Sequence, residues 1–184
     1  MNTDTSCRRA VRRQAEYAAE RDVPWGISEC AYNLSDHHGN YQYKAFGVPG
    51  LGLKRGLGDD LVVAPYATAL AAMIDPIAAA RNLRRLAAAG LEGEYGFYES
   101  IDYTHGLADE AAPATRPTPA GGAVVRAYFA HHQGMTLVAL ANALLGDRMV
   151  KRFHADPRVQ ATELVLQERV PRHAPISQPR PVEE

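Results

Sequence analysis

Residues 129–145 read FAHHQGMTLVALANALL, a stretch rich in alanine and leucine that is apolar on nearly every side when it is drawn as a helix. Gly146 follows directly, and glycine is the residue that most often ends a helix. A helix without a polar face should be buried on most sides, as in a protein built from layers of helices. The stretch therefore predicts a buried helix in an all-α fold.

Further helices are expected on both sides of this stretch. Asp75 is a good N-cap for one of them, with Pro76 at the first helical position. The additional expected helices are 7–22, 66–74, 75–90 and 156–168. Strand–helix alternation is absent and runs of β-branched residues are few, so the expected fold class is all-α.

The composition indicates an ordinary globular protein. The chain has 184 residues, 46% of them hydrophobic, and a formal net charge of −1. This fits one domain with a sizeable core. The near-neutral charge argues against nucleic acid as a partner, because phosphate neutralisation needs a clustered basic surplus. Cys7 and Cys30 form neither a disulfide framework nor a CxxC pair, so both are expected to be free thiols.

Neither a membrane span nor a signal peptide is expected. The apolar runs stay below the roughly 18 residues that a membrane helix needs. The N-terminal residues MNTDTSCRRA lack the apolar core of a signal peptide. The chain as given is therefore expected to be cytoplasmic.

Two long segments between the expected helices, 24–60 and 93–105, are rich in aromatic residues, glycine and acids. Loops of this length in a helical domain are usually functional, or else they contradict the helix assignment. The segment 108–122 has Pro, Ala, Thr and Gly without aromatics, which predicts a mobile excursion. The proline-rich residues 172–184 predict a linker or frayed end, so the expected domain spans 1–171.

The acids of the two aromatic segments are candidates for chemistry on sugars. Aromatic rings beside carboxylates are typical of carbohydrate sites, because sugar C–H faces stack on rings while carboxylates accept hydroxyl hydrogen bonds. Glycoside cleavage needs two carboxyls, one of them kept protonated by an apolar setting. Glu29 in PWGISECAYN and Glu99 in GFYESIDY have such a setting. The alternative interpretation is that each acid caps a helix or pairs with an arginine.

The adjacent residues His131 and His132 raise the question of a metal. Neighbouring side chains on a helix point about 100° apart, so the two histidines are not expected to share one ion. The sequence has no HExxH motif and no Cys/His set with zinc spacing. No metal site is expected. One histidine is expected to face a pocket and the other to be a hydrogen-bonded core residue.

The glycine-rich stretch GVPGLGLKRGLG, residues 47–58, does not predict a nucleotide site. Its glycine spacing fits neither GxxxxGK[ST] nor GxGxxG, and no strand is expected before it. It is interpreted as a tight loop that brings Lys54 and Arg55 to the rim of a cleft.

Six motifs in one order resemble the glycoamylase-like region of bacterial cyclic β-1,2-glucan synthases. The resemblance covers most of the chain, from about Arg8 to Pro171. The motifs are WGISECAYN (25–33), YQYKAFGVPGLGLKRGL (41–57), VVAPYATALAAMIDP (62–76), YGFYESIDYT (95–104), RAYFAHHQGMTLVALAN (126–142) and RFHADPRVQATELVLQERVP (152–171).

The resemblance implies a fold and a set of partners. In that family the region is an (α/α)6 toroid between a membrane glycosyltransferase part and a phosphorylase-like part. A full toroid needs far more residues, so this chain is expected to be its C-terminal half. Residues 66–74 and 129–145 would be inner or sandwiched helices, leaving one apolar flank open. The remaining half and the two flanking parts would be partners, in a parent protein of the inner membrane.

The resemblance also implies an activity, retaining transglycosylation that closes linear β-1,2-glucan into a ring, whereas soluble relatives hydrolyse such glucans. Glu29 would be the general acid/base and Glu99 the second carboxylate, with Asp102 as the alternative. No cofactor is implied. The expected substrate-binding residues are Trp25, Tyr32, Tyr41, Tyr43, Lys54, Arg55, Tyr98, His131, His132 and Gln133.

Two other interpretations stay open. The chain could be a non-catalytic carbohydrate-binding or structural fragment, whose carboxylates only hydrogen-bond sugar. It could also be an interaction domain without a role in sugar chemistry.

Overall fold

The computed structural model describes residues 3–52, 54–106, 121–163 and 165. The chain divides into two compact units, residues 1–147 and 148–184. Most of the expected mobile segment 108–122 lies outside the described residues, and so do the expected domain boundary at 171 and the end of the helix expected up to 168.

The helices expected from the sequence are present. Those of the first unit are α1 (Thr3–Ala19), α2 (Pro65–Ala71), α3 (Pro76–Leu86), which continues into the π-helical turn η1 (Ala87–Leu91), and α4 (Ala130–Leu145). The second unit has α5 (Arg148–His154), which the sequence analysis missed, and α6 (Pro157–Glu163). No helix in the described part of the chain is long and apolar enough to cross a membrane.

The ends of these helices have the expected causes. The Asp75 side chain accepts a hydrogen bond from the backbone N–H of Ala78 (2.9 Å), which caps α3. Gly90 has a φ of 91° inside η1, and Gly146 has a φ of 61° after α4. Glycine adopts these left-handed conformations without the steric cost of a Cβ atom, so both helices end where the sequence predicts.

The expected all-α fold and partial toroid are wrong, because the first unit also contains three small antiparallel sheets. The strands are β1 (Cys30–Ser35) paired with β2 (Tyr41–Lys44), β6 (Ser100–Asp102) between β3 (Val62–Val63) and β7 (Ala123–Val125), and β4 (Glu92–Gly93) paired with β5 (Gly96–Phe97). Strands this short carry almost no periodicity. They lie in and beside the two aromatic segments, so the length of those segments was the sign that the assignment was incomplete.

The core lies where the three-stranded sheet meets the helices. Val63 of β3 pairs with Ile101 of β6, which pairs in turn with Val124 of β7. All three side chains are buried, together with Leu86 and Leu91 from the end of α3 and from η1. β-Branched residues pack well on a pleated surface, which explains why these short stretches pair as strands.

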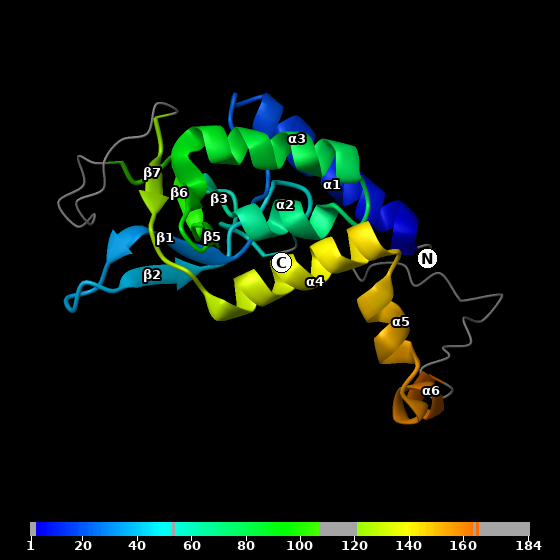
Figure 1. Cartoon of the computed structure of the whole chain (residues 1–184). Helices are drawn as coiled ribbons and strands as arrows, with labels where there is room; N and C mark the ends of the chain where they lie inside the picture. Colours follow the sequence, from blue (N-terminus) through cyan, green and yellow to red (C-terminus); the bar gives the residue numbers. More distant parts are fainter. Residues whose placement is uncertain (1–2, 53, 107–120, 164, 166–184) are drawn as a thin grey trace, which may run out of the picture. The chain divides into compact units, whose positions relative to one another are not determined.

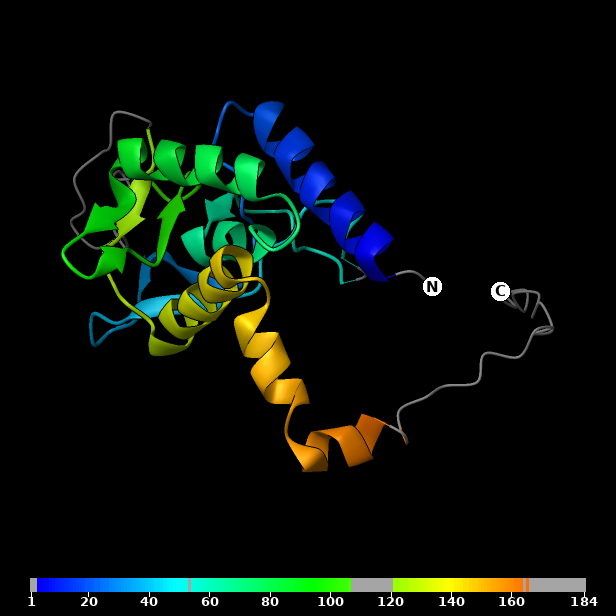
Figure 2. The same ribbon diagram turned by 45° about the vertical axis from the view of Figure 1, so that its right-hand side comes forward.

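Helix α2 is the sandwiched helix that its sequence predicts. It packs against both α3 and α4 (Figures 1 and 2). Five of its seven residues are buried, so the apolar stretch YATALAAMI has neighbours on several sides.

Helix α4 differs from the expectation of a helix buried nearly all round. Its buried residues are His132, Ala139 and Asn142, which lie on one face. Leu137 and Leu144 are 69% and 79% exposed, and Val138 and Leu145 are exposed as well. At about 100° per residue these four form an apolar face roughly opposite the buried one. In the described residues α4 therefore has one covered face and one open apolar face.

The backbone of residues 25–27 is held by one side chain from each of three helices. Asn82 of α3 accepts a hydrogen bond from the Trp25 N–H (3.1 Å) and donates to the Trp25 carbonyl (2.7 Å). Thr68 of α2 donates to the same carbonyl (2.9 Å). Gln14 of α1 donates to the Ile27 carbonyl (2.7 Å) and accepts from its N–H (2.9 Å). This segment lies outside any helix or strand, so its backbone groups need side-chain partners. The bonds to Gln14, Thr68 and Asn82 therefore fix the segment that leads into β1.

We expect Gly26→Ala to lower the free energy of unfolding by about 2–4 kcal/mol. Gly26 has a φ of 125°, and an added Cβ would lie 2.8 Å from the Thr68 hydroxyl and 2.9 Å from the Ala64 carbonyl oxygen. Urea denaturation of the purified chain measures the change.

The matched control is Gly134→Ala in α4, where an added Cβ has no atom within 4 Å apart from its chain neighbours and the backbone of its own helix. This change should stabilise the chain by about 0.5–1 kcal/mol, because alanine is the better helix former. Equal effects of the two substitutions would contradict the constraint at Gly26.

Candidate active site

A buried carboxylate and a buried histidine form the centre of the candidate site. Glu99 comes directly before β6, and its side chain is 1% exposed. Nδ1 of His132, in the first turn of α4, lies 2.9 Å from both Glu99 carboxylate oxygens. The Ala31 N–H of β1 also donates to Glu99 Oε1 (3.2 Å). An ionised carboxylate only accepts, so with Glu99 ionised the Nδ1–H of His132 is the donor of this contact.

Two tyrosines fix the His132 ring. The Tyr66 ring of α2 stacks on it, with 3.8 Å between the ring centroids and 11° between the planes. The Tyr43 hydroxyl of β2 lies 3.3 Å from His132 Nε2. Carboxylate, stacked ring and hydroxyl together orient the imidazole, as expected for a group that handles protons or binds a ligand.

The two phenols are poor acids in this setting. Burial, followed by the charge of Glu29, raises the pKa of Tyr43 well above its usual value. Burial raises the pKa of Tyr66 to about 12, and Glu29 contributes again. Both hydroxyls therefore stay protonated at neutral pH and can donate hydrogen bonds.

Glu29 is exposed at the edge of this cluster, directly before β1. Its backbone carbonyl oxygen lies 3.2 Å from the Tyr66 hydroxyl. One carboxylate oxygen of Glu29 and one ring nitrogen each of His131 and His132 lie within 4.8 Å of one another. The sequence predicted an apolar setting among aromatic residues for Glu29. The structure instead places it beside the two histidines, outside the cavity that Glu99 lines.

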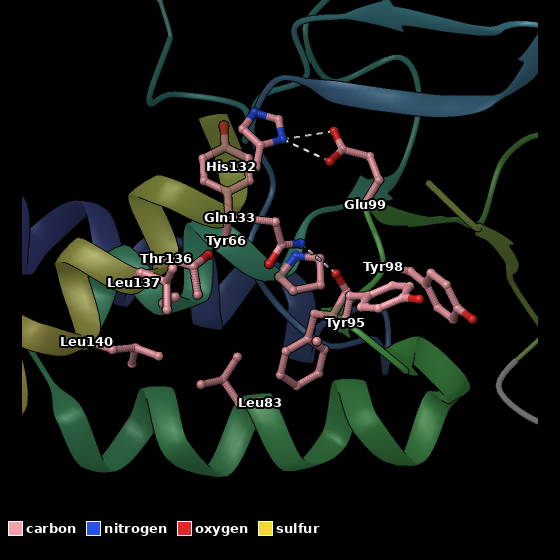
Figure 3. A pocket seen from close by; sticks show the side chains of 14 residues that line it. Tyr66, Leu83, Tyr95, Tyr98, Glu99, His132, Gln133, Thr136, Leu137 and Leu140 are labelled. Atoms are coloured by element: carbon pink, nitrogen blue, oxygen red, sulfur yellow. Dashed lines mark hydrogen bonds and ion pairs between the residues drawn. The ribbon is translucent and has the colours of Figure 1, made fainter. Parts of the chain in front are cut away.

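A cavity of about 240 Å³ lies next to the His132–Glu99 pair (Figure 3). Aromatic rings, one carboxylate and amide groups are what a sugar site uses. Among the lining residues Glu99 is the one acid. The residues that line the cavity are Pro65, Tyr66, Ala69, Leu83, Tyr95, Gly96, Phe97, Tyr98, Glu99, His132, Gln133, Thr136, Leu137 and Leu140.

Gln133 and Tyr98 lie in this cavity, as expected for substrate-binding residues. The Gln133 amide donates to the Phe97 carbonyl (2.8 Å), which ties α4 to β5. The Tyr98 ring lies 5.1 Å from the Tyr128 ring between centroids. Both residues therefore have fixed positions in the wall.

Asp102 lies away from the cavity, and its carboxylate has a structural role. It is completely buried in β6. Its carboxylate accepts backbone hydrogen bonds from Asn33, Thr104 and His105, each at 2.9 Å, and lies 3.0 Å from Nδ1 of His105. These bonds organise the turn after β6, so Glu99 is the better placed of the two candidates for the second carboxylate.

The aromatic residues that were expected to bind sugar do not all lie at one site. Trp25 is buried in a core cluster with α1, α2 and α3, away from the cavity. Tyr32 packs edge-on against Phe46, and Tyr41 pairs with Ser35 in the first hairpin. Of these expected sugar contacts, only Tyr43 and Tyr98 contribute to the His132 cluster or the cavity.

The two basic residues of the glycine-rich loop are exposed, and Lys54 lines a separate depression formed by residues 47–59. They are therefore not part of the cavity next to His132. His131 is exposed, whereas His132 is both the hydrogen-bonded core histidine and the one that faces the cavity. We had expected these two roles to fall on different residues.

Sequence reasoning missed several residues of the site. Tyr66 was assigned to an apolar helix, although a tyrosine directly after the proline that starts a helix is an available signal. Tyr95 and Phe97 belong to the same aromatic segment as Glu99, yet neither was singled out. Only the packing of α2 on α4 brings Tyr66 to His132.

The site has an oriented histidine, two nearby glutamates and an aromatic cavity, which are features that suit a carbohydrate enzyme. Comparisons with known proteins point to the same class of protein. The chain belongs to the glycoamylase family, described as "Putative glucoamylase", whose model matches residues 3–157. One relative is the cyclic beta-(1,2)-glucan synthase NdvB of Rhizobium meliloti (strain 1021), with 46% identity over 166 residues. The match covers 90% of this chain and 6% of that protein. The resemblance inferred from the six motifs is confirmed.

We expect Glu99→Gln to lower the free energy of unfolding by about 1–3 kcal/mol, because a buried pair with His132 loses its charge and gains an amide without an acceptor. Glu29→Gln is the same substitution at an exposed position and should change the free energy of unfolding by less than about 0.5 kcal/mol. Urea denaturation of both variants tests this difference. Similar losses for the two would mean that the Glu99–His132 pair does not stabilise the fold.

Proposed function

We propose that the chain acts on linear β-1,2-glucan by retaining transglycosylation, as part of a carbohydrate enzyme. The observation that carries this proposal is the aromatic cavity with the Glu99–His132 pair in its wall and Glu29 close to the same histidine. The match to a cyclic β-1,2-glucan synthase supports the choice of substrate.

Glu29 is the proposed general acid/base. It is exposed, so a glycosidic oxygen can reach its carboxyl. In the first step its proton passes to that oxygen while Glu99 attacks the anomeric carbon and the leaving chain departs. In the second step Glu29 takes a proton from an acceptor hydroxyl of the same glucan, which displaces Glu99 and closes the ring. With water as the acceptor, the same two steps give hydrolysis.

The proposed role of Glu99 sets a structural requirement. Both of its oxygens lie 2.9 Å from His132 Nδ1, and its side chain is 1% exposed. Direct attack on a sugar therefore requires that the contact with His132 opens on the side of the cavity when substrate enters. Until then the imidazole shields the carboxylate from water.

A non-catalytic carbohydrate-binding role is the second candidate, and the burial of Glu99 favours it. A carboxylate already engaged by His132 and the Ala31 N–H can act in structure alone. In that case Tyr98 and Gln133 would bind sugar without bond cleavage.

Incubation of the purified chain with linear β-1,2-glucan, followed by analysis for rings and short oligomers, tests the proposal. Glu29→Gln should reduce turnover about 100-fold or more, the usual contribution of a positioned acid/base. Glu92→Gln, an exposed glutamate of β4, is the matched control and should retain full turnover. Binding of glucan without products from the unmodified chain would support the non-catalytic role, and normal turnover of Glu29→Gln would move the acid/base role to another group.

We also propose that the open apolar face of α4 contacts other parts of a longer glucan synthase. Leu137, Val138, Leu144 and Leu145 are exposed on one face of this helix. Clustered exposed apolar residues usually mark an interaction site. The chain spans 6% of the length of its relative, which leaves ample polypeptide to cover them.

We expect the purified chain to self-associate through this face, and the triple variant Leu137→Gln/Leu144→Gln/Leu145→Gln to sediment as a monomer. Ile77→Gln removes a single exposed apolar residue of α3 (66% exposed) and should leave the association unchanged. Sedimentation velocity measures the difference. A stable monomer with a cooperative melt in the unmodified chain would contradict the proposal.

A further inference from the structure

Three metal-ligating side chains converge next to the buried Glu99–His132 pair. Glu29 lies directly before β1, and His131 and His132 lie in the first turn of α4. Each contributes one ligand atom, and these atoms lie within 4.8 Å of one another. In tetrahedral zinc sites the bonds of about 2.0–2.1 Å place ligand atoms about 3.3–3.5 Å apart. Rotation of the exposed Glu29 and His131 side chains can supply the remaining contraction.

The two histidines approach each other more closely than their sequence positions suggest. Their ring centroids lie 3.9 Å apart with 50° between the planes. Side-chain rotation therefore offsets the divergence of about 100° between neighbouring residues of a helix. The expectation that the two histidines do not share an ion was based on backbone direction alone. Because their rings lie close together, backbone direction no longer excludes a shared ion.

His132 is held in the orientation that a metal site requires. Its Nδ1 lies 2.9 Å from the Glu99 carboxylate, which leaves Nε2 as the ring nitrogen that can face an ion. This carboxylate–histidine arrangement is the outer-shell support found behind most metal-binding histidines, where it fixes the ring and raises its basicity. The Tyr43 hydroxyl lies 3.3 Å from Nε2. This distance is long for a hydrogen bond, so an ion could displace the hydroxyl.

The surroundings favour a cation. Glu29 contributes a carboxylate to the cluster itself, and Glu99 holds a second carboxylate against the His132 ring. Lys44, the nearest basic residue in the same hairpin, is paired with Asp60.

We propose that Glu29, His131 and His132 form a binding site for a divalent transition-metal ion, with Zn²⁺ as the best fit. Two imidazole nitrogens and one carboxylate oxygen are ligands typical of zinc, whereas Mg²⁺ and Ca²⁺ prefer oxygen alone. A fourth coordination position would be open to water. The site goes beyond the proposed glucan activity and does not depend on it, and while an ion is bound Glu29 is not available as the acid/base.

Titration of the purified, metal-free chain with Zn²⁺ in competition with a chromophoric chelator tests the site. We expect one ion per chain, and no competition by millimolar Mg²⁺. His131→Ala and Glu29→Gln should each weaken zinc binding about 10-fold or more. Both residues are exposed, so neither change should disturb folding, which circular dichroism verifies.

The chain offers a matched control in His37 and His38, which are also adjacent and exposed, with ring centroids 3.7 Å apart. The double variant His37→Ala/His38→Ala should bind zinc as tightly as the unmodified chain. Loss of binding in this variant, unchanged binding in His131→Ala, or no binding by the unmodified chain would each overturn the site. Loss of glucan turnover in Glu29→Gln with unchanged zinc affinity would overturn the metal site and leave the proposed function intact.

Discussion

The first unit is organised around one buried carboxylate, that of Glu99. It accepts hydrogen bonds from the backbone of β1 and from the His132 ring of α4, and it stands at the start of β6. A buried carboxylate without partners is costly, so the arrangement persists only while all three segments keep their places. The short sheets and the helices are therefore connected at one polar point as well as by the apolar core.

A second constraint comes from backbone groups that no regular structure satisfies. Residues 25–27 lie outside helix and strand, and the N–H and C=O groups of Trp25 and Ile27 are bonded by Gln14, Thr68 and Asn82. Because these side chains come from α1, α2 and α3, the packing of three helices determines where the chain enters β1. The position of Glu29 follows from that packing.

The three candidate carboxylates have distinct physical settings. Asp102 organises a turn through backbone N–H groups, and Glu99 orients a histidine from a buried position. Glu29 is exposed beside His131 and His132. Burial and hydrogen bonding, which the sequence does not display, separate structural acids from those available to a ligand. His132 links the two sides of the site, since it faces the cavity and also lies next to Glu29.

Local signals in the sequence determined the helices, their ends at Asp75, Gly90 and Gly146, and the membership in the glycoamylase family through six ordered motifs. They also pointed to Glu29, Glu99 and His132 as candidates. Such signals act within a few residues of the chain, so a sequence displays them directly. Only the tertiary structure decided that two- to six-residue strands pair into sheets, that Glu99 meets a histidine 33 positions away, and that buried Asp102 accepts a hydrogen bond from Asn33, 69 positions away. These outcomes depend on contacts between distant segments, whose free energy exists only when the chain is folded.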